Sequence, residues 1–285
     1  MTQGRGLRRP VVLLLTLTLV GGGVYTAVTF LQRSETLVSE RCTAVVGSQS
    51  AELATDQAVN ASLITAVAVQ RGLPPRAASI ALATAMQESK LRNINHGDQA
   101  GPDSRGLFQQ RPSQGWGTEA QVMDPYYAAN AFYDALEKIP DYQSLEITDA
   151  AQRVQRSAYP RAYAEHEGMG RSFASGFTGQ TPGAVHCTLR APIDAGDPAA
   201  VASELELAYG TLGTATDGQS LLVEASGSQA WSLAQWAVAN AKDFEVTQVD
   251  VEGHSWNRNA KDGWQDSDAA PGQVRITVSP VASEN

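Results

Sequence analysis

Glu88 is the residue of this sequence best placed to do chemistry. It follows an uncharged run of small and apolar residues, from Ala77 to Gln87, whose spacing predicts a helix buried against a core. A carboxylate at the end of such a helix is partly removed from water, and desolvation raises the pKa of a carboxyl group. A glutamic acid with a raised pKa donates a proton near neutral pH, as cleavage of a glycosidic bond requires. The sequence therefore predicts Glu88 as a general acid.

Two motifs accompany this acid. Glu88-Ser89 is followed by a polar loop rich in Gly and Asp, and then by Gly106-Leu107-Phe108-Gln109. The pair resembles the ES and GLMQ motifs of the lytic transglycosylase and goose-type lysozyme group within the lysozyme-like superfamily, with Phe108 in place of the usual Met. The Ala-Tyr pair of that group is matched by Ala158-Tyr159, where Pro160 replaces the usual Asn.

The resemblance covers about residues 54–170. In detail, this region is similar to a subgroup of secreted or anchored proteins of high-GC Gram-positive bacteria. It implies a lytic transglycosylase or lysozyme-type glycosidase that cleaves peptidoglycan without a cofactor. In the implied mechanism Glu88 protonates the leaving oxygen and then takes the proton of the muramyl 6-hydroxyl, so that a 1,6-anhydro sugar forms. Ser89 and Gln109 hold the amide or hydroxyl groups of the sugar, and Tyr159 hydrogen-bonds the glutamate.

A hydrolase with two carboxylates is the alternative mechanism, and it needs a second acid about 5 to 9 Å from the first. Asp98 and Asp103 of the loop are candidates, and Asp103 is also a candidate contact to the substrate. The other interpretation, which the loop composition favours, is that both are solvated turn residues. At the level of function, the alternative is a catalytically inactive lysozyme-like protein that binds sugar or belongs to an envelope or secretion apparatus.

No metal site is expected. His96, His166 and His186 match no ligand spacing, and the two cysteines lack the short spacing of zinc sites. Cys42 and Cys187 instead predict a disulfide, provided that this part of the chain is exported. The bond would enclose the lysozyme-like region in a loop of about 146 residues, which is worth on the order of 5 kcal/mol in the chain-entropy model.

The N-terminus carries a segment long enough to cross a membrane. Arginines at positions 5, 8 and 9 precede residues 11–31, an uncharged run that covers a hydrocarbon core of roughly 30 Å at about 1.5 Å per residue. A cleaved leader has the same design, but the length of the run and the lack of a small-x-small site favour an uncleaved anchor. The arginines place the N-terminus in the cytoplasm and the chain beyond about residue 35 outside.

The charge of the expected exported part bears on whether the protein binds nucleic acid. Residues 1–33 contain four arginines and no acids, which leaves 17 basic and 30 acidic residues and a net charge of about −13. Such a balance disfavours nucleic acid. The expected partners are the glycan strands of peptidoglycan and, through the N-terminal helix, the cytoplasmic membrane.

The expected fold class is a mainly α lysozyme-like domain after an N-terminal transmembrane helix, followed by a small α/β domain. In the last part, helices are predicted at 199–209 and 229–241 and strands at 221–225, 246–251 and 273–278. Trp231 and Trp236 are expected to be core residues. Trp256 and Trp264 could be buried or could stack on sugar rings. The expected segments are a basic tail (1–10), a transmembrane anchor (11–31), a stalk (32–53), the lysozyme-like domain (54–187), a linker (188–198) and the α/β domain (199–285). The α/β domain is expected to fold alone and to serve targeting or regulation.

Overall fold

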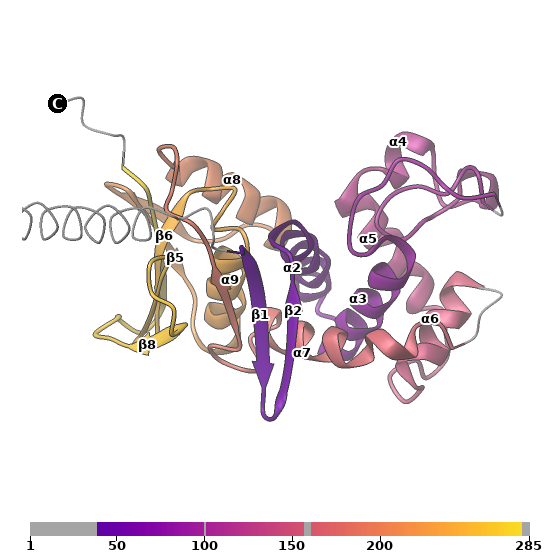
Figure 1. Ribbon diagram of the computed structural model, residues 1–285, viewed down its shortest axis with the longest axis horizontal. Coiled ribbons are helices and arrows are strands. Elements are labelled where there is room, and N and C mark those ends of the chain that lie inside the picture. The colour runs from indigo at the N-terminus through magenta and orange to yellow at the C-terminus, as the bar shows by residue number, and fades with distance from the viewer. Residues whose placement is uncertain (1–38, 100, 157–160, 281–285) are drawn as a thin grey trace, which may run out of the picture. The chain divides into compact units, whose positions relative to one another are not determined.

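The computed structural model describes residues 39–280 except Ala100 and 157–160 (Figure 1). Its first element is a hairpin of β1 (Arg41–Val46) and β2 (Gln49–Leu53), and β3 (Val185–Thr188) pairs antiparallel with the free edge of β1. Cys42 and Ala44 are buried while their neighbours in β1 are more exposed, which is the alternation of a strand with one face on a core. The stalk expected at 32–53 therefore contains a β-hairpin.

Cys42 and Cys187 lie directly opposite each other in the pairing of β1 with β3, and a disulfide bond joins them. The predicted disulfide is confirmed. Both cysteines are buried, and 145 positions of sequence separate them. The bond and the strand pairing together hold the two ends of the helical region side by side.

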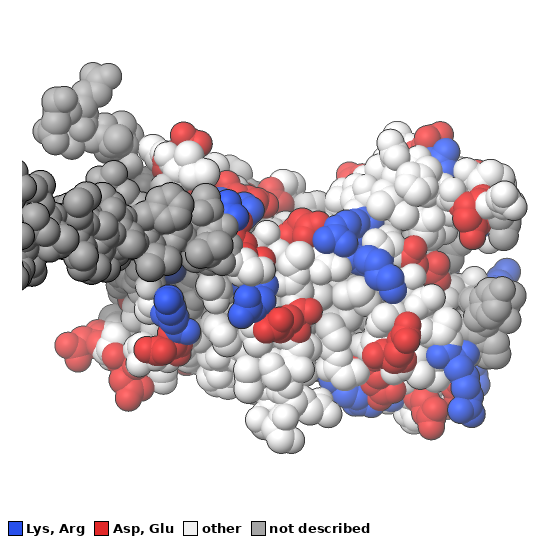
Figure 2. All heavy atoms as spheres, viewed as in Figure 1, with Lys and Arg blue, Asp and Glu red and all other residues white. Residues whose placement is uncertain are grey.

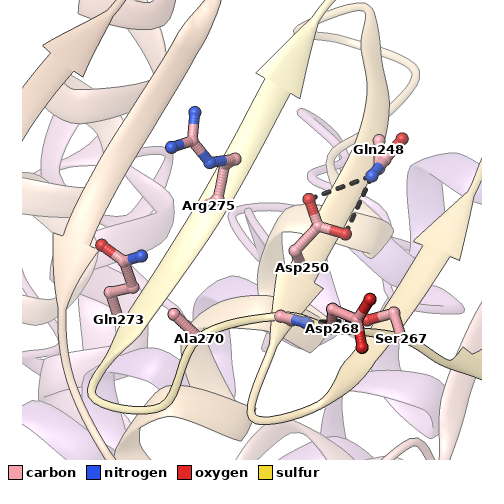
Figure 3. A pocket seen from close by; sticks show the side chains of 8 residues that line it. Gln248, Asp250, Ser267, Asp268, Ala270, Gln273 and Arg275 are labelled. Carbon is pink, nitrogen blue, oxygen red and sulfur yellow. Dashed lines mark hydrogen bonds between the residues drawn. The ribbon is translucent and has the colours of Figure 1, made fainter.

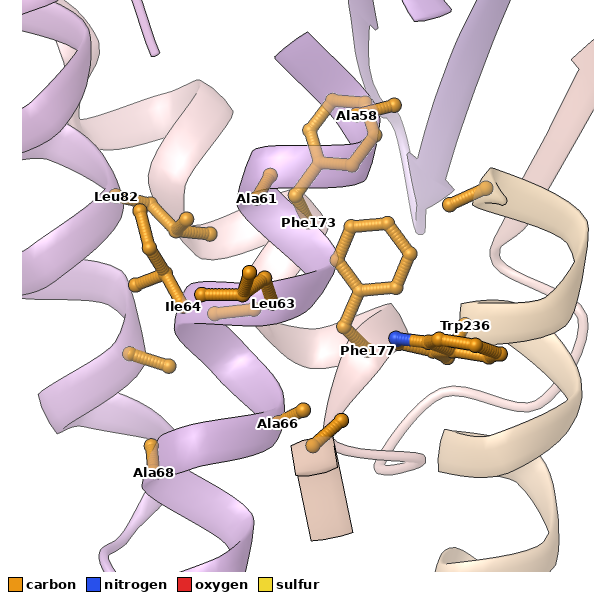
Figure 4. Packing of buried hydrophobic residues seen from close by; sticks show 14 of the residues in the cluster. Ala58, Ala61, Leu63, Ile64, Ala66, Ala68, Leu82, Phe173, Phe177 and Trp236 are labelled. Atoms are coloured by element: carbon orange, nitrogen blue, oxygen red, sulfur yellow. The ribbon is translucent and has the colours of Figure 1, made fainter. Parts of the chain in front are cut away.

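The helical region between β2 and β3 is arranged around α3, which packs against α2, α5, α6 and α7. Gly170 of α7 allows close approach, because a Cβ at this position would lie 2.8 Å from the carbonyl oxygen of Ser79 in α3. Figure 4 shows part of the apolar core, where side chains of α2, α3, α7 and α9 pack together. The helices of this region are α2 (Thr55–Gln70), α3 (Pro75–Ser89), α4 (Glu119–Val122), α5 (Pro125–Leu136), α6 (Ile147–Gln155) and α7 (Glu167–Phe177), with 3₁₀ turns η2 (Pro112–Gln114) and η3 (Ala164–His166).

The remaining strands form a second, six-stranded sheet that is antiparallel throughout, in the order β4-β5-β9-β6-β7-β8. Both helices of this part, α8 and α9, pack on the sheet (Figure 1). The predicted helices and strands of this part are confirmed to within two residues, whereas β4, β7 and β8 were not predicted. The elements are α8 (Pro198–Tyr209), β4 (Thr214–Asp217), β5 (Ser220–Glu224), α9 (Gly227–Ala239), β6 (Val246–Val251), β7 (His254–Asn257), β8 (Trp264–Asp266) and β9 (Gln273–Val278).

Helix α9 connects the second sheet to the helical region. Trp231 and Trp236 are buried, as predicted, and α9 packs on α2, α7 and β3 as well as on the sheet. The buried amide of Gln235 donates to the carbonyl oxygen of Gly176 at 2.7 Å and accepts from the amide N–H of Val185 at 2.7 Å. Residues from Glu40 onward group as one unit, and independent folding of 199–285 stays a prediction.

The other two tryptophans of this part differ in exposure. Trp256 is fully buried. Trp264 is half-buried, and its indole N–H donates to the carbonyl oxygen of Val185 at 2.8 Å. Trp256 is thus a core residue, and the hydrogen bond of Trp264 links β8 to β3.

The expected fold class is wrong. The structure is mixed α/β, 41% helical and 20% strand, with two antiparallel sheets. The sheet of β1, β2 and β3 was missed because β3 has only four residues and its partner lies far away in the sequence. Within the described residues no helix is long and apolar enough to span a membrane, and the expected anchor at 11–31 lies outside those residues.

Candidate active site

Glu88 is the penultimate residue of α3, whose residues from Ala77 to Ala85 are buried. Its half-buried position removes the carboxylate from water, and this desolvation raises its pKa. Hydrogen bonds from Tyr163 and Gln155 act in the opposite direction, and the negative charge of Asp98 adds to the increase. The net effect is a raised pKa, as the sequence predicts for a general acid.

Tyr163 is the tyrosine that the structure places against the acid. Its hydroxyl donates to Oε1 of Glu88 at 2.7 Å, and its side chain is buried just before η3. Tyr163 belongs to a second Ala-Tyr pair, four positions after Ala158-Tyr159. The first pair lies outside the described residues, so the role expected for Tyr159 stays a prediction. The repeated pair was the one signal in the sequence that pointed to Tyr163.

Ser89 joins α3 to the loop that carries the second motif. Its buried hydroxyl donates to the carbonyl oxygen of Leu107 at 2.7 Å and accepts from the amide N–H of Arg92 at 3.2 Å. The side chain is not among those that line the cleft described below. This geometry gives Ser89 a positioning role, and contact with a sugar stays a prediction.

The segment Gly106–Gln109 anchors the loop in the core. Leu107 and Phe108 are buried, and the Phe108 ring stacks on Phe132 with centroids 4.6 Å apart. Gly106 has a φ of 77°, and a Cβ there would lie 2.1 Å from the carbonyl oxygen of Val122. Only glycine fits without a shift of the backbone.

Gly106→Ala is therefore expected to destabilise the protein more than Gly218→Ala. Gly218, in the turn between β4 and β5, also has a positive φ, but a Cβ added there would meet no atom within 4 Å. Both variants lose about 1 kcal/mol from the left-handed backbone, and the contact with Val122 adds about 1 to 3 kcal/mol at Gly106. Urea unfolding measures the free energy of unfolding of both variants. Equal losses would show that the backbone around Gly106 accommodates the added methyl group without a further loss of stability.

Gln155, the last residue of α6, is a site residue that the sequence did not reveal. Its amide nitrogen donates to the carbonyl oxygen of Phe108 at 2.8 Å, and its side chain also hydrogen-bonds Glu88. One amide thus connects the acid to the buried motif. Nothing in the local sequence distinguishes Gln155 from the other glutamines of this region.

A cleft of about 600 Å³ opens beside Glu88, where α3, the loop and the end of α6 meet. Gln109, predicted as a sugar ligand, lines it. Trp116 also lines it, and its indole is a flat apolar surface of the kind on which sugar rings stack. The complete lining is Gln87, Glu88, Ile94, His96, Gly97, Asp98, Gly101, Ser104, Gln109, Arg111, Gln114, Trp116, Gln155, Arg156, Ala162 and Tyr163.

The two loop aspartates occupy different environments. Asp98 lines the cleft, and its Oδ1 accepts from the amide N–H of Gly101 at 2.8 Å. Asp103 does not line the cleft. Hydrogen bonds from Ser113 and the ion pair with Arg111 hold the pKa of Asp103 well below its usual range, so this carboxylate stays ionised. Asp98 is the better candidate for a second catalytic carboxylate.

The histidines do not assemble into a ligand set. His96 lines the cleft, and Nε2 of His166 lies 3.0 Å from Oε1 of Gln87. Burial lowers the pKa of His166. Within residues 39–280, leaving out the undescribed positions, no group of three or more His, Cys, Asp or Glu side chains is arranged to hold a metal ion.

A second hollow, of about 420 Å³, lies on the six-stranded sheet and is lined by polar side chains of β6, β9 and the connection between β8 and β9 (Figure 3). The amide of Gln248 donates to both carboxylate oxygens of Asp250, at 2.8 and 3.0 Å. Arg275 forms an ion pair with Asp217 at 2.9 Å. The cleft at Glu88 holds a half-buried carboxyl group with a raised pKa, so it is the candidate active site.

Tyr163→Phe is expected to change the pH dependence of any reaction that uses Glu88 as an acid. The hydroxyl stabilises the ionised carboxylate, so its removal raises the pKa of Glu88 further. Because the acid acts in its protonated form, the decline of activity with rising pH moves to higher pH. Maximal activity falls about tenfold, since a hydrogen bond to a charged group contributes roughly 1.5 kcal/mol or more.

The measurement is a pH–rate profile, with Tyr209→Phe as the control. Tyr209 is a partly buried tyrosine, and its hydroxyl contacts Oγ of Ser232 at 3.0 Å, away from the cleft. If the alkaline limb of the pH–rate profile of Tyr163→Phe lies at the same pH as in the unsubstituted protein, Tyr163 does not set the pKa of Glu88.

No protein-family model matches this sequence, and a search of curated proteins finds no match either. The function proposed below therefore rests on the chemistry of the residues in the cleft.

Proposed function

We propose that this protein cleaves glycosidic bonds in the glycan strands of peptidoglycan, as a lytic transglycosylase or a lysozyme-type muramidase. The observation that carries the proposal is Glu88, a half-buried acid with a raised pKa, held by Tyr163 and Gln155 at the wall of a polar cleft. General acid catalysis of bond cleavage between sugars needs a protonated carboxyl group in such a position. Trp116 offers a stacking surface for the sugar rings beside the acid.

The first step transfers the proton of Glu88 to the glycosidic oxygen. The bond between C1 and this oxygen breaks, the leaving sugar departs as an alcohol, and positive charge develops at C1 while Glu88 becomes a carboxylate. In the transglycosylase route the 6-hydroxyl of the same muramyl residue attacks C1 and returns its proton to Glu88. In the hydrolytic route a water molecule attacks C1, and Asp98 is the carboxylate placed in the cleft to assist it.

The test is incubation of the purified protein with purified cell wall, followed by mass analysis of the soluble fragments. A 1,6-anhydro end is lighter than a hydrolysed end by one water, so the product mass identifies the route. Binding to the wall without release of fragments would support the alternative, an inactive sugar-binding or structural component of the envelope. Absence of both binding and release would exclude peptidoglycan as the ligand.

We also propose that the protein acts outside the cytoplasmic membrane, anchored by residues 11–31. The disulfide between Cys42 and Cys187 supports this placement, because such bonds persist in oxidising compartments and are rare in the cytosol. Protease treatment of intact cells tests it, since an outward-facing protein is degraded without lysis.

A further inference from the structure

Two arginines from separate elements line the cleft of Glu88. Arg111 comes from the loop just before η2, and Arg156 follows the end of α6. The formal net charge of the chain is −9, and Figure 2 shows acidic and basic side chains mixed over the face in view. The lining of the cleft holds these two arginines together with Asp98 and Glu88, and Glu88 acts in its uncharged form. The described lining of the cleft therefore carries at least as much positive as negative charge, whereas the chain as a whole is acidic.

The guanidinium group of Arg111 is held in place from outside the cleft. Its Nε donates to Oδ1 of Asp103 at 2.8 Å, and Oδ2 of Asp103 accepts from the amide N–H of Ser113 at 3.0 Å. Pro112 restricts the backbone of Arg111 to an extended conformation, with φ −110° and ψ 117°. Arg111 is therefore presented to the cleft in a defined position, and Asp103 is the residue that positions it.

Arg156 lies at the rim in an uncommon conformation. Its φ is 52°, in the left-handed region that residues other than glycine rarely adopt, and its side chain is exposed. Among the described residues, no hydrogen bond or ion pair of this side chain is seen. Strained backbone of this kind is concentrated at binding and active sites.

We infer that Arg111 and Arg156 bind carboxylate groups of the substrate, so that the cleft selects glycans that carry carboxylates over neutral amino-sugar polymers. This inference rests on the proposed function and specifies its substrate class. The planar guanidinium group forms paired, charge-assisted hydrogen bonds with a carboxylate, a geometry that neutral sugars do not offer. The carboxylate belongs either to the free lactyl group of a muramyl sugar that carries no peptide or to an attached peptide.

Binding to three glycans tests this inference: intact peptidoglycan fragments, strands freed of their peptides, and neutral chitin oligosaccharides. Affinities are measured by calorimetry in a Glu88→Gln background, so that the substrates are not consumed. Arg111→Gln and Asp103→Asn are compared with Arg275→Gln. Arg275 is a matched control because it also pairs with an aspartate, at 2.9 Å against 2.8 Å for Arg111, and lies away from the cleft.

Arg111→Gln is expected to weaken binding of a carboxylate-bearing glycan about tenfold, a change of about 1.4 kcal/mol, without affecting chitin oligosaccharides. Asp103→Asn shows a smaller loss of the same kind, and Arg275→Gln shows none. Loss on the peptide-free strands identifies the lactyl carboxylate, and loss confined to intact fragments identifies the peptide carboxylate.

Equal weakening on chitin and on the anionic glycans would overturn the inference, because it would indicate a purely structural role for Arg111. Unchanged binding of every glycan in Arg111→Gln would overturn it as well. If the Glu88→Gln protein binds all three glycans equally and the unsubstituted protein cleaves wall, the inference fails and the proposed function stands. If neither form binds nor cleaves any glycan, both fail.

Discussion

Glu88→Gln is expected to lower the release of fragments from purified cell wall by about 10²- to 10⁴-fold, the usual contribution of a positioned general acid. Glutamine has nearly the same shape and still accepts the hydrogen bond from the Tyr163 hydroxyl, but it has no proton of suitable acidity for the glycosidic oxygen. Glu206→Gln, on the exposed surface of α8, is the matched control and should retain full activity. Activity of Glu88→Gln at the level of this control would exclude Glu88 from the mechanism.

The same variant is expected to gain stability at neutral pH. The pKa of Glu88 is raised in the folded protein, so its ionisation opposes folding as the pH rises above the ordinary pKa of a glutamate. Glutamine does not ionise, and the free energy of unfolding of Glu88→Gln should therefore exceed that of the unsubstituted protein at neutral pH but not at acidic pH. Urea unfolding at both pH values measures the difference. A loss of activity together with a loss of stability at neutral pH would point to misfolding instead.

Removal of the disulfide by the double substitution Cys42→Ala and Cys187→Ala is expected to lower the free energy of unfolding by about 2 to 5 kcal/mol. The bond closes a long loop, since 145 positions separate the two cysteines, and it therefore restricts the unfolded chain strongly. The hydrogen bonds between β1 and β3 do not depend on the sulfur atoms, so the fold itself should be retained.

The measurement is urea unfolding of the double variant and of the unsubstituted protein. Reduction of the unsubstituted protein in denaturant, followed by refolding under reducing conditions, is the control, and it should reproduce the loss seen in the variant. An unchanged midpoint in both cases would mean that the pairing of β1 with β3 alone holds the ends of the helical region together.

The features that the sequence determined by itself are local or periodic. The uncharged helix before Glu88 is evident from the spacing of its apolar residues, and the burial that raises the pKa of this acid follows from that spacing. The strand at 273–278 alternates in polarity, and this strand and the one at 246–251 were predicted at their observed positions. The disulfide was predictable because a chain with two cysteines has a single way to pair them.

Tertiary structure alone decided which side chains meet at the acid. Tyr163 and Gln155 reach Glu88 from a distant part of the chain, and no local pattern selects them over neighbouring tyrosines and glutamines. The different roles of Asp98 and Asp103 depend on the path of one loop, which turns the first into the cleft and the second toward Arg111. The pairing of β1 with β3 and the packing of α9 on the helical region were missed for the same reason. Contacts between residues far apart in sequence depend on how the whole chain packs. Periodicity along the sequence predicts the elements but not which of them come into contact.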